Sequence, residues 1–123
     1  MLKDYVKVFR AMGEPTRMHM LRLLATRELY VCELEAVLGI SQPRVSLHLR
    51  TLREAGLVLE EKDGRKTRIS LDKARLFGAL TGFAAFLTCD LSDLPAFAQD
   101  LERLQQLEGS PLPCPCSEPD DAR

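Results

Sequence analysis

Apolar residues recur every three or four positions through the first 56 residues, and this spacing predicts four helices. The first covers residues 2–12 and ends at Gly13, and the second begins near Pro15, which suits the first turn of a helix. The third lies within residues 28–39, and the fourth runs from Ser41 to Gly56. The expected apolar faces are formed by Leu2, Tyr5, Val6, Phe9, Met12, Met18, Leu21, Leu24, Ala25, Val31, Leu34, Val37, Leu38, Val45, Leu49, Leu52 and Ala55. Arg17 is expected on the water-exposed side of the second helix.

The pattern changes after the fourth helix. Two short extended runs flank Asp63-Gly64, a dipeptide typical of a two-residue hairpin turn. A fifth helix is expected at residues 72–88, and its apolar stripe is wider than a small core needs. A surplus apolar face is usually covered by a partner, so this helix and the first predict a dimer interface. Residues 95–107 predict a last amphipathic helix.

These elements predict a mainly α protein with a small β-hairpin. The architecture expected is a winged helix-turn-helix with five to six helices and a two-stranded wing, assembled as a homodimer. Residues 1–89 would form the DNA-binding and dimerisation domain. Residues 90–123 would form an amphipathic helix and a flexible, acidic tail rich in Cys and Pro.

Charge is distributed unevenly along the 123 residues, although the net charge is only -1. Residues 41–89 hold nine Lys and Arg against five Asp and Glu, whereas residues 90–123 hold two against eight. A local basic patch is what a nucleic-acid-binding surface requires, so the near-neutral total does not argue against one. No apolar run is long enough to span a membrane, charges interrupt the N-terminus, and we expect a cytoplasmic protein.

Residues 28–58 read as a helix, a tight turn at Gly39-Ile40 and a second helix with basic and hydroxyl side chains. This is the pattern of a helix-turn-helix DNA reader. Gln42 can pair with adenine and Arg44 with guanine, and the hairpin cations can reach phosphates. The candidate DNA-contacting residues are Ser41, Gln42, Arg44, Val45, Ser46, His48 and Arg50 in the helix, with Lys62, Arg65, Lys66 and Arg68 in the hairpin.

Residues 3–88 resemble the ArsR/SmtB family of winged-helix metalloregulatory repressors. EPTRMHMLRLL is similar to the family's second helix, SQPRVSLHLRTLREAGLV to its recognition helix, and YVCEL to its third-helix metal segment. The resemblance implies a homodimer that binds a palindromic operator and dissociates when an effector binds. The fifth helix contains no histidine, which departs from the zinc-responsive members.

The cysteines are the candidate sensing residues, because soft thiolates bind thiophilic metals. Cys89, Cys114 and Cys116 could supply the three thiolates that As(III) or Sb(III) prefers, as the family resemblance implies. Cys32 could replace Cys89, although Tyr30 stands where the arsenic-responsive pattern has a second cysteine. The sequence therefore predicts an arsenic-responsive repressor whose effector is As(III) or Sb(III). No catalytic cofactor is expected.

Two alternatives remain open at this stage. The first is a repressor of the same fold that senses oxidants or persulfides through its thiols. The second is a metal-buffering protein without specific DNA binding. An enzyme is not expected, because the sequence shows no nucleophile–base arrangement or phosphate-binding loop.

Overall fold

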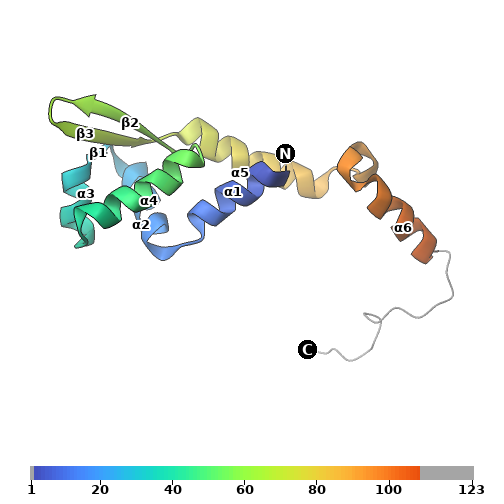
Figure 1. The fold of residues 1–123 in the computed structure, drawn as a ribbon. Helices are drawn as coiled ribbons and strands as arrows, with labels where there is room; N and C mark the ends of the chain where they lie inside the picture. The colour runs from blue at the N-terminus through green and yellow to red at the C-terminus, as the bar shows by residue number, and fades with distance from the viewer. Residues whose placement is uncertain (1, 109–123) are drawn as a thin grey trace. The chain divides into compact units, whose positions relative to one another are not determined.

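The computed structural model describes residues 2–108, which form six α-helices and a three-stranded antiparallel sheet (Figure 1). The described residues divide into two compact units, and the division falls between Ala85 and Phe86. The domain boundary expected after residue 89 stays a prediction. No helix in the described residues is both long and apolar enough to cross a membrane.

The five helices predicted up to residue 88 are all present. They are α1 (Leu2–Met12), α2 (Pro15–Thr26), α3 (Val31–Leu38), α4 (Gln42–Glu54) and α5 (Lys73–Thr88). Local residues explain where helices begin and end. Pro15 occupies the first turn of α2, where its missing N–H removes no hydrogen bond. Gly39 ends α3 with φ 68°, a left-handed conformation that glycine adopts without steric cost.

The core lies where α1, α2, α3 and α4 meet the sheet, and its most deeply buried side chains include Met20, Leu34, Leu52, Leu57 and Ile69. Several residues of the predicted apolar faces lie at the surface instead. The side chains of Met18 and Val37 are 57% and 60% exposed, and Leu2, Val6 and Ala25 are exposed as well.

Apolar residues that the spacing did not select, namely Val8, Ala11 and Met20, are buried instead. The physical reason is that α1 and α2 carry apolar residues on more than one side. The neighbouring helices then decide which side of each helix is inside, and periodicity does not contain that information.

The sheet has one strand more than the two predicted. Its strands are β1 (Leu29–Tyr30), β2 (Val58–Asp63) and β3 (Lys66–Leu71), in the order β1-β3-β2. A two-residue strand is too short to show an alternating pattern, but buried Leu29 pairs with Ile69 at the centre of the sheet.

The wing is the hairpin of β2 and β3, and it projects from the helices in Figure 1. Asp63 pairs with Lys66, so its turn consists of Gly64-Arg65 and not of Asp63-Gly64. Gly64 has φ 66°, as a tight hairpin turn requires.

The apolar face of α5 is only partly covered within the described chain, where Leu76 and Ala79 pack against the core. No residue of α5 is buried, and the side chains of Phe77 and Leu80 are 56% and 40% exposed. Phe83 packs edge-on against Tyr5 and Phe9 of α1, with ring centroids 5.4 and 4.7 Å apart. Helices α1 and α5 therefore present adjoining apolar surface, and the dimer interface expected on them stays a prediction.

The second unit contains two 3-10 turns, η1 (Leu91–Asp93) and η2 (Pro95–Phe97), followed by α6 (Ala98–Glu108). The rings of Phe86 and Phe97 pack with centroids 5.8 Å apart. The helix expected from residue 95 thus begins with a 3-10 turn, and its α-helical part starts at Ala98. The expected tail, including Cys114 and Cys116, lies outside the described residues.

Candidate nucleic-acid interface

Helix α4 is anchored by its apolar face, which leaves the opposite face open to water. Val45 and Leu52 are fully buried and Leu49 is almost fully buried. Gln42, Arg44 and Arg50 are exposed, and Ser46 is half-buried beside them. The start of α4 therefore presents the side chains that the sequence predicts as base-reading groups.

Two residues at the start of α4 are arranged by local contacts. The side-chain amide of Gln42 donates to the hydroxyl of Ser46 at 2.6 Å, which holds both polar groups on one side of the helix. Ser41 is the N-cap residue and is exposed, but its side chain makes no capping hydrogen bond. Its hydroxyl is thus not used by the helix end.

Two residues predicted to contact DNA are engaged within the protein instead. Val45 is fully buried in the core and is removed from the candidate interface. The side chain of His48 is only 14% exposed, and its Nδ1 lies 3.2 Å from Nη1 of Arg17. A neutral imidazole with unprotonated Nδ1 accepts a hydrogen bond from that guanidinium. His48 therefore holds α4 against α2 instead of facing a ligand.

Leu47 is the exposed residue of α4 that sequence reasoning missed. Its side chain is 59% exposed, on the side of the helix opposite Val45 and Leu49. An apolar side chain in this position can contact a thymine methyl group. The available signal was its place two residues from Val45 and Leu49, which puts it outside the buried stripe.

The exposed cations of the wing differ in whether another side chain holds them. Lys62 and Arg65 are exposed, and within residues 2–108 neither forms an ion pair. Lys66 lies over the ring of Tyr30, with Nζ 4.9 Å from its centroid. Lys62 and Arg65 are therefore the wing cations most available to a phosphate backbone.

Arg68, also predicted to contact DNA, is held by acidic neighbours instead. It pairs with Glu61 at 2.8 Å, Asp63 at 3.3 Å and Glu28 at 3.5 Å. The hydrogen bond to Glu61 is the main cause that raises the pKa of Arg68. Asp63 also accepts from the hydroxyl of Tyr30 at 2.6 Å, and this bond raises the pKa of that phenol. Arg68 and Asp63 thus tie the wing to Glu28 and Tyr30, which precede α3.

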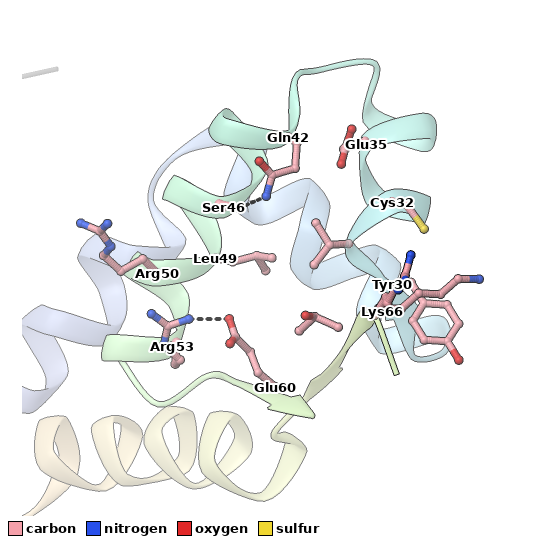
Figure 2. A pocket seen from close by; sticks show the side chains of 13 residues that line it. Tyr30, Cys32, Glu35, Gln42, Ser46, Leu49, Arg50, Arg53, Glu60 and Lys66 are labelled. Atoms are coloured by element: carbon pink, nitrogen blue, oxygen red, sulfur yellow. Dashed lines mark hydrogen bonds and ion pairs between the residues drawn. The ribbon is translucent and has the colours of Figure 1, made fainter. Parts of the chain in front are cut away.

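A groove of about 480 Å³ separates the start of α4 from the wing and from α3. In Figure 2, Gln42 and Ser46 lie on the α4 side, with Tyr30 and Lys66 across from them. Arg53 and Glu60 form an ion pair that joins the end of α4 to β2. Cys32 and Glu35 of α3 line the same groove.

The junction between α1, α2 and α4 is held by a cluster that sequence reasoning missed. Arg17 donates from Nε to the carbonyl of Ala11 at 2.6 Å, although periodicity placed its side chain in water. Glu14 is the N-cap of α2, accepts from the N–H of Arg17 at 2.8 Å and lies 3.9 Å from Nδ1 of His48. The spacing of Glu14 and Arg17 around Pro15 was the available signal for such a cap.

Replacing Glu14 with alanine is expected to lower the melting temperature by roughly 4 °C at pH 7, because the first turn of α2 loses its cap. The hydrogen bond from the N–H of Arg17 is the main cause that lowers the pKa of Glu14 below 4.5. The stabilisation is therefore fully present above pH 4.5 and is lost as pH falls through the lowered pKa. Thermal melts followed by circular dichroism at pH 7 and pH 3 would measure this, with the exposed Glu102→Ala as control. An equal effect at both pH values would contradict the carboxylate's role.

The cysteines of the described chain are separate surface residues. Cys32 lies in the first turn of α3, and Cys89 follows the end of α5, with its thiol 3.6 Å from the carbonyl of Phe86. Both are exposed free thiols. Within residues 2–108, no three His, Cys, Asp or Glu side chains gather in a metal-ligand geometry. A three-thiolate site thus needs a residue from outside this range or from a second chain.

The chain is similar in sequence to bacterial transcriptional regulators. Residues 14–59 match the family model described as bacterial regulatory protein, arsR family. The "Probable mercury resistance operon repressor" of Streptomyces lividans is 40% identical over 70 residues, which cover 57% of this chain and 56% of that protein. The "HTH-type transcriptional regulator CmtR" of Mycobacterium tuberculosis is 34% identical over 90 residues, covering 73% of this chain and 76% of that protein.

Solved structures agree with these matches. The crystal structure of a "Possible transcriptional regulator for arsenical resistance" superposes with a TM-score of 0.60 and 37% identity, covering 75% of this chain and 96% of that one. For the first curated relatives, the matched region spans about half of their own length. These three similar proteins are named as a repressor or as regulators.

Proposed function

Because the chain belongs to the ArsR family of bacterial regulatory proteins, we propose that it is a transcriptional repressor that binds double-stranded operator DNA as a homodimer. A thiophilic metal or metalloid bound to cysteine thiolates releases it. The observation that carries the proposal is the open face of α4, where Gln42, Arg44 and Arg50 are exposed. Gln42 and Arg50 line a groove whose other side includes the wing cation Arg65, unpaired within residues 2–108.

In this proposal α4 enters the major groove, which is wide enough to admit a helix. Gln42 and Arg44 at its start read base edges, while Arg50 and the hydroxyls of Ser41 and Ser46 contact bases or phosphates. Lys62, Arg65 and Lys66 of the wing contact the backbone and position the protein on the duplex. Val45, His48 and Arg68 take no direct part, because each is engaged within the protein.

The exposed apolar surface of α5 supports the homodimer. Phe77, Leu80 and Leu87 of α5 are exposed large hydrophobic side chains. A twofold dimer would bury them and would place two copies of α4 on successive turns of a palindromic operator. Dimerisation thus explains an apolar area that a monomer leaves in water.

The effector proposed is As(III) or Sb(III), bound by Cys89, Cys114 and Cys116. The names of similar proteins support a soft effector, since one concerns mercury resistance and another arsenical resistance. Cys89 is exposed and available as a ligand. Cys32 is the alternative third ligand, and its place in the groove beside α4 would couple binding directly to the DNA-reading face.

Release from DNA requires only a small change in dimer geometry. Cys89 directly follows α5, the helix proposed to form the dimer interface. A ligand that draws this end of α5 into a metalloid site would change the spacing of the two recognition helices. A coupling free energy of about 1–3 kcal/mol is enough for useful regulation.

The proposal is tested by measuring DNA binding before and after effector addition. Duplexes that the protein retains from a random library would define the operator, and fluorescence anisotropy would give its affinity. Binding should weaken steeply with salt, because phosphate contacts release counterions. Arsenite or antimonite should then dissociate the complex, whereas zinc should not. A protein that selects no duplex sequence would sink the repressor proposal in favour of metal buffering.

A second candidate, a thiol-based sensor of oxidants or persulfides, is favoured by the exposure of Cys32 and Cys89. Such sensors need accessible thiols that react with an oxidant or a sulfane sulfur. The same assay separates the two mechanisms. Release by hydrogen peroxide or polysulfide, without release by arsenite, would establish the redox mechanism.

A further inference from the structure

Three cations form a ridge on α1, beside the recognition helix. Lys3, Lys7 and Arg10 are all exposed, and their spacing of four and three residues places them on one side of the helix. Within residues 2–108, none of the three forms an ion pair. We name these residues the α1 ridge.

The α1 ridge borders a groove of about 550 Å³ between α1 and α4. Thr51 and Glu54 line the α4 side of this groove, and Leu2 and Val6 contribute apolar surface on the α1 side. Thr51 lies one helical turn after Leu47, the most exposed apolar residue of α4. The ridge groove therefore begins where the open face of α4 ends.

The two grooves beside α4 lie on different sides of that helix. The wing groove is lined by Gln42, Ser46 and Arg53 of α4, and the ridge groove by Thr51 and Glu54. A helix in the major groove has one phosphate backbone on each side of it. The wing cations can contact one of these two phosphate backbones. The second backbone, on the other side of α4, has no protein contact assigned to it.

We infer that the α1 ridge is a second phosphate-binding surface, which holds the DNA strand on the side of α4 away from the wing. This inference rests on the proposed function. The ridge spans about 10.5 Å along α1 at 1.5 Å per residue. That length corresponds to roughly three nucleotides, since one strand rises about 3.4 Å per phosphate along the duplex axis.

Charge availability distinguishes the ridge from other cations of the domain. Arg53 is paired with Glu60, Arg27 with Glu33 and Arg68 with three acids, so these cations are already compensated. In the ridge groove, Glu54 is the single acidic lining residue against three cations. A polyanion gains most where unpaired cations lie in a row, because each contact releases counterions.

The ridge is compatible with a dimer interface on the same helix. Tyr5 and Phe9 face α5, where they pack against Phe83. Arg10 lines the groove toward α4, and Lys7 lies where that groove meets a second groove toward the first half of α5. One side of α1 can thus adjoin a partner while another side meets DNA.

The test compares two triple variants of the full-length protein. The ridge variant carries Lys3→Gln, Lys7→Gln and Arg10→Gln, and the control carries Arg22→Gln, Lys73→Gln and Arg103→Gln. The control removes the same charge from exposed residues that do not line the groove. Glutamine keeps helix propensity close to that of lysine and arginine. Binding to the selected duplex and to a random duplex is measured from about 50 to about 200 mM salt, a range over which phosphate contacts weaken strongly.

The ridge variant should show a salt slope smaller by about 1 for each residue that contacts a phosphate. The affinities for selected and random duplex should fall by the same factor, and sedimentation should show an unchanged oligomeric state. A slope equal to that of the parent, or an equal loss in the control variant, would overturn the ridge while leaving the repressor proposal standing. A parent protein that binds no duplex would overturn both.

Discussion

Replacing Gln42 and Arg44 together with alanine is expected to weaken operator binding by roughly 30-fold to 10⁴-fold, since a bidentate base contact contributes about 1–3 kcal/mol. Both side chains are exposed at the start of α4, and neither belongs to the core. The loss should be much smaller on a random duplex, because base contacts carry the sequence preference. Fluorescence anisotropy on both duplexes measures the two affinities.

The matched control is Arg103→Ala with Gln105→Ala, which removes the same two side-chain types from exposed positions of α6. Its operator affinity should stay within about twofold of the parent, because surface substitutions away from a binding site have small effects. Both double variants should keep the parent's melting temperature. Equal affinity losses on selected and random duplexes would show that Gln42 and Arg44 contact only the backbone.

Replacing Cys114 and Cys116 together with serine is expected to abolish release by arsenite. In the parent, saturating arsenite should weaken operator binding by about 5-fold to 150-fold, the usual range of allosteric coupling. In the double variant this factor should fall to one, because serine hydroxyls do not replace thiolates as ligands for a soft metalloid. Operator affinity without arsenite should be unchanged, and Ser110→Ala is the control in the same segment of the sequence.

Single variants then identify the third ligand. Loss of the response in Cys89→Ser, with Cys32→Ser responding like the parent, supports the site proposed at the end of α5. The opposite result moves the site to the groove beside α4. X-ray absorption at the arsenic edge should count three sulfur ligands in the parent and fewer in each variant that loses a ligand. An arsenite response that survives in the Cys114, Cys116 double variant would rule out the tail as a ligand source.

The order of the helices could be predicted from the sequence because each is marked locally. Apolar spacing marks α3 and α4, Pro15 marks the start of α2, and Gly39 marks the turn between α3 and α4. The hairpin was marked by Gly64, although its turn lies one residue later than predicted. Strand β1 was missed because two residues carry no periodicity, and only its pairing with β3 defines it.

The candidate interface was predictable as an element and less so residue by residue. Gln42, Arg44 and Arg50 are exposed as expected, since they lie off the apolar stripe of α4. His48 is also off that stripe, yet it is drawn inward by Arg17 of α2. Such contacts join residues more than 30 positions apart in the chain, and no local pattern contains them.

Membership of the ArsR family, the succession of helices and the identity of the open face of α4 all follow from the amino-acid sequence. Family membership follows from similarity of sequence, whereas the helices and the open face follow because helix periodicity and capping are short-range effects that act within a few residues. The tertiary structure decided which cations remain unpaired, since Arg68 is engaged by Glu28, Glu61 and Asp63 while the α1 ridge is not. It also placed α1 and the wing on two sides of α4, because packing between distant segments determines which side chains share a surface.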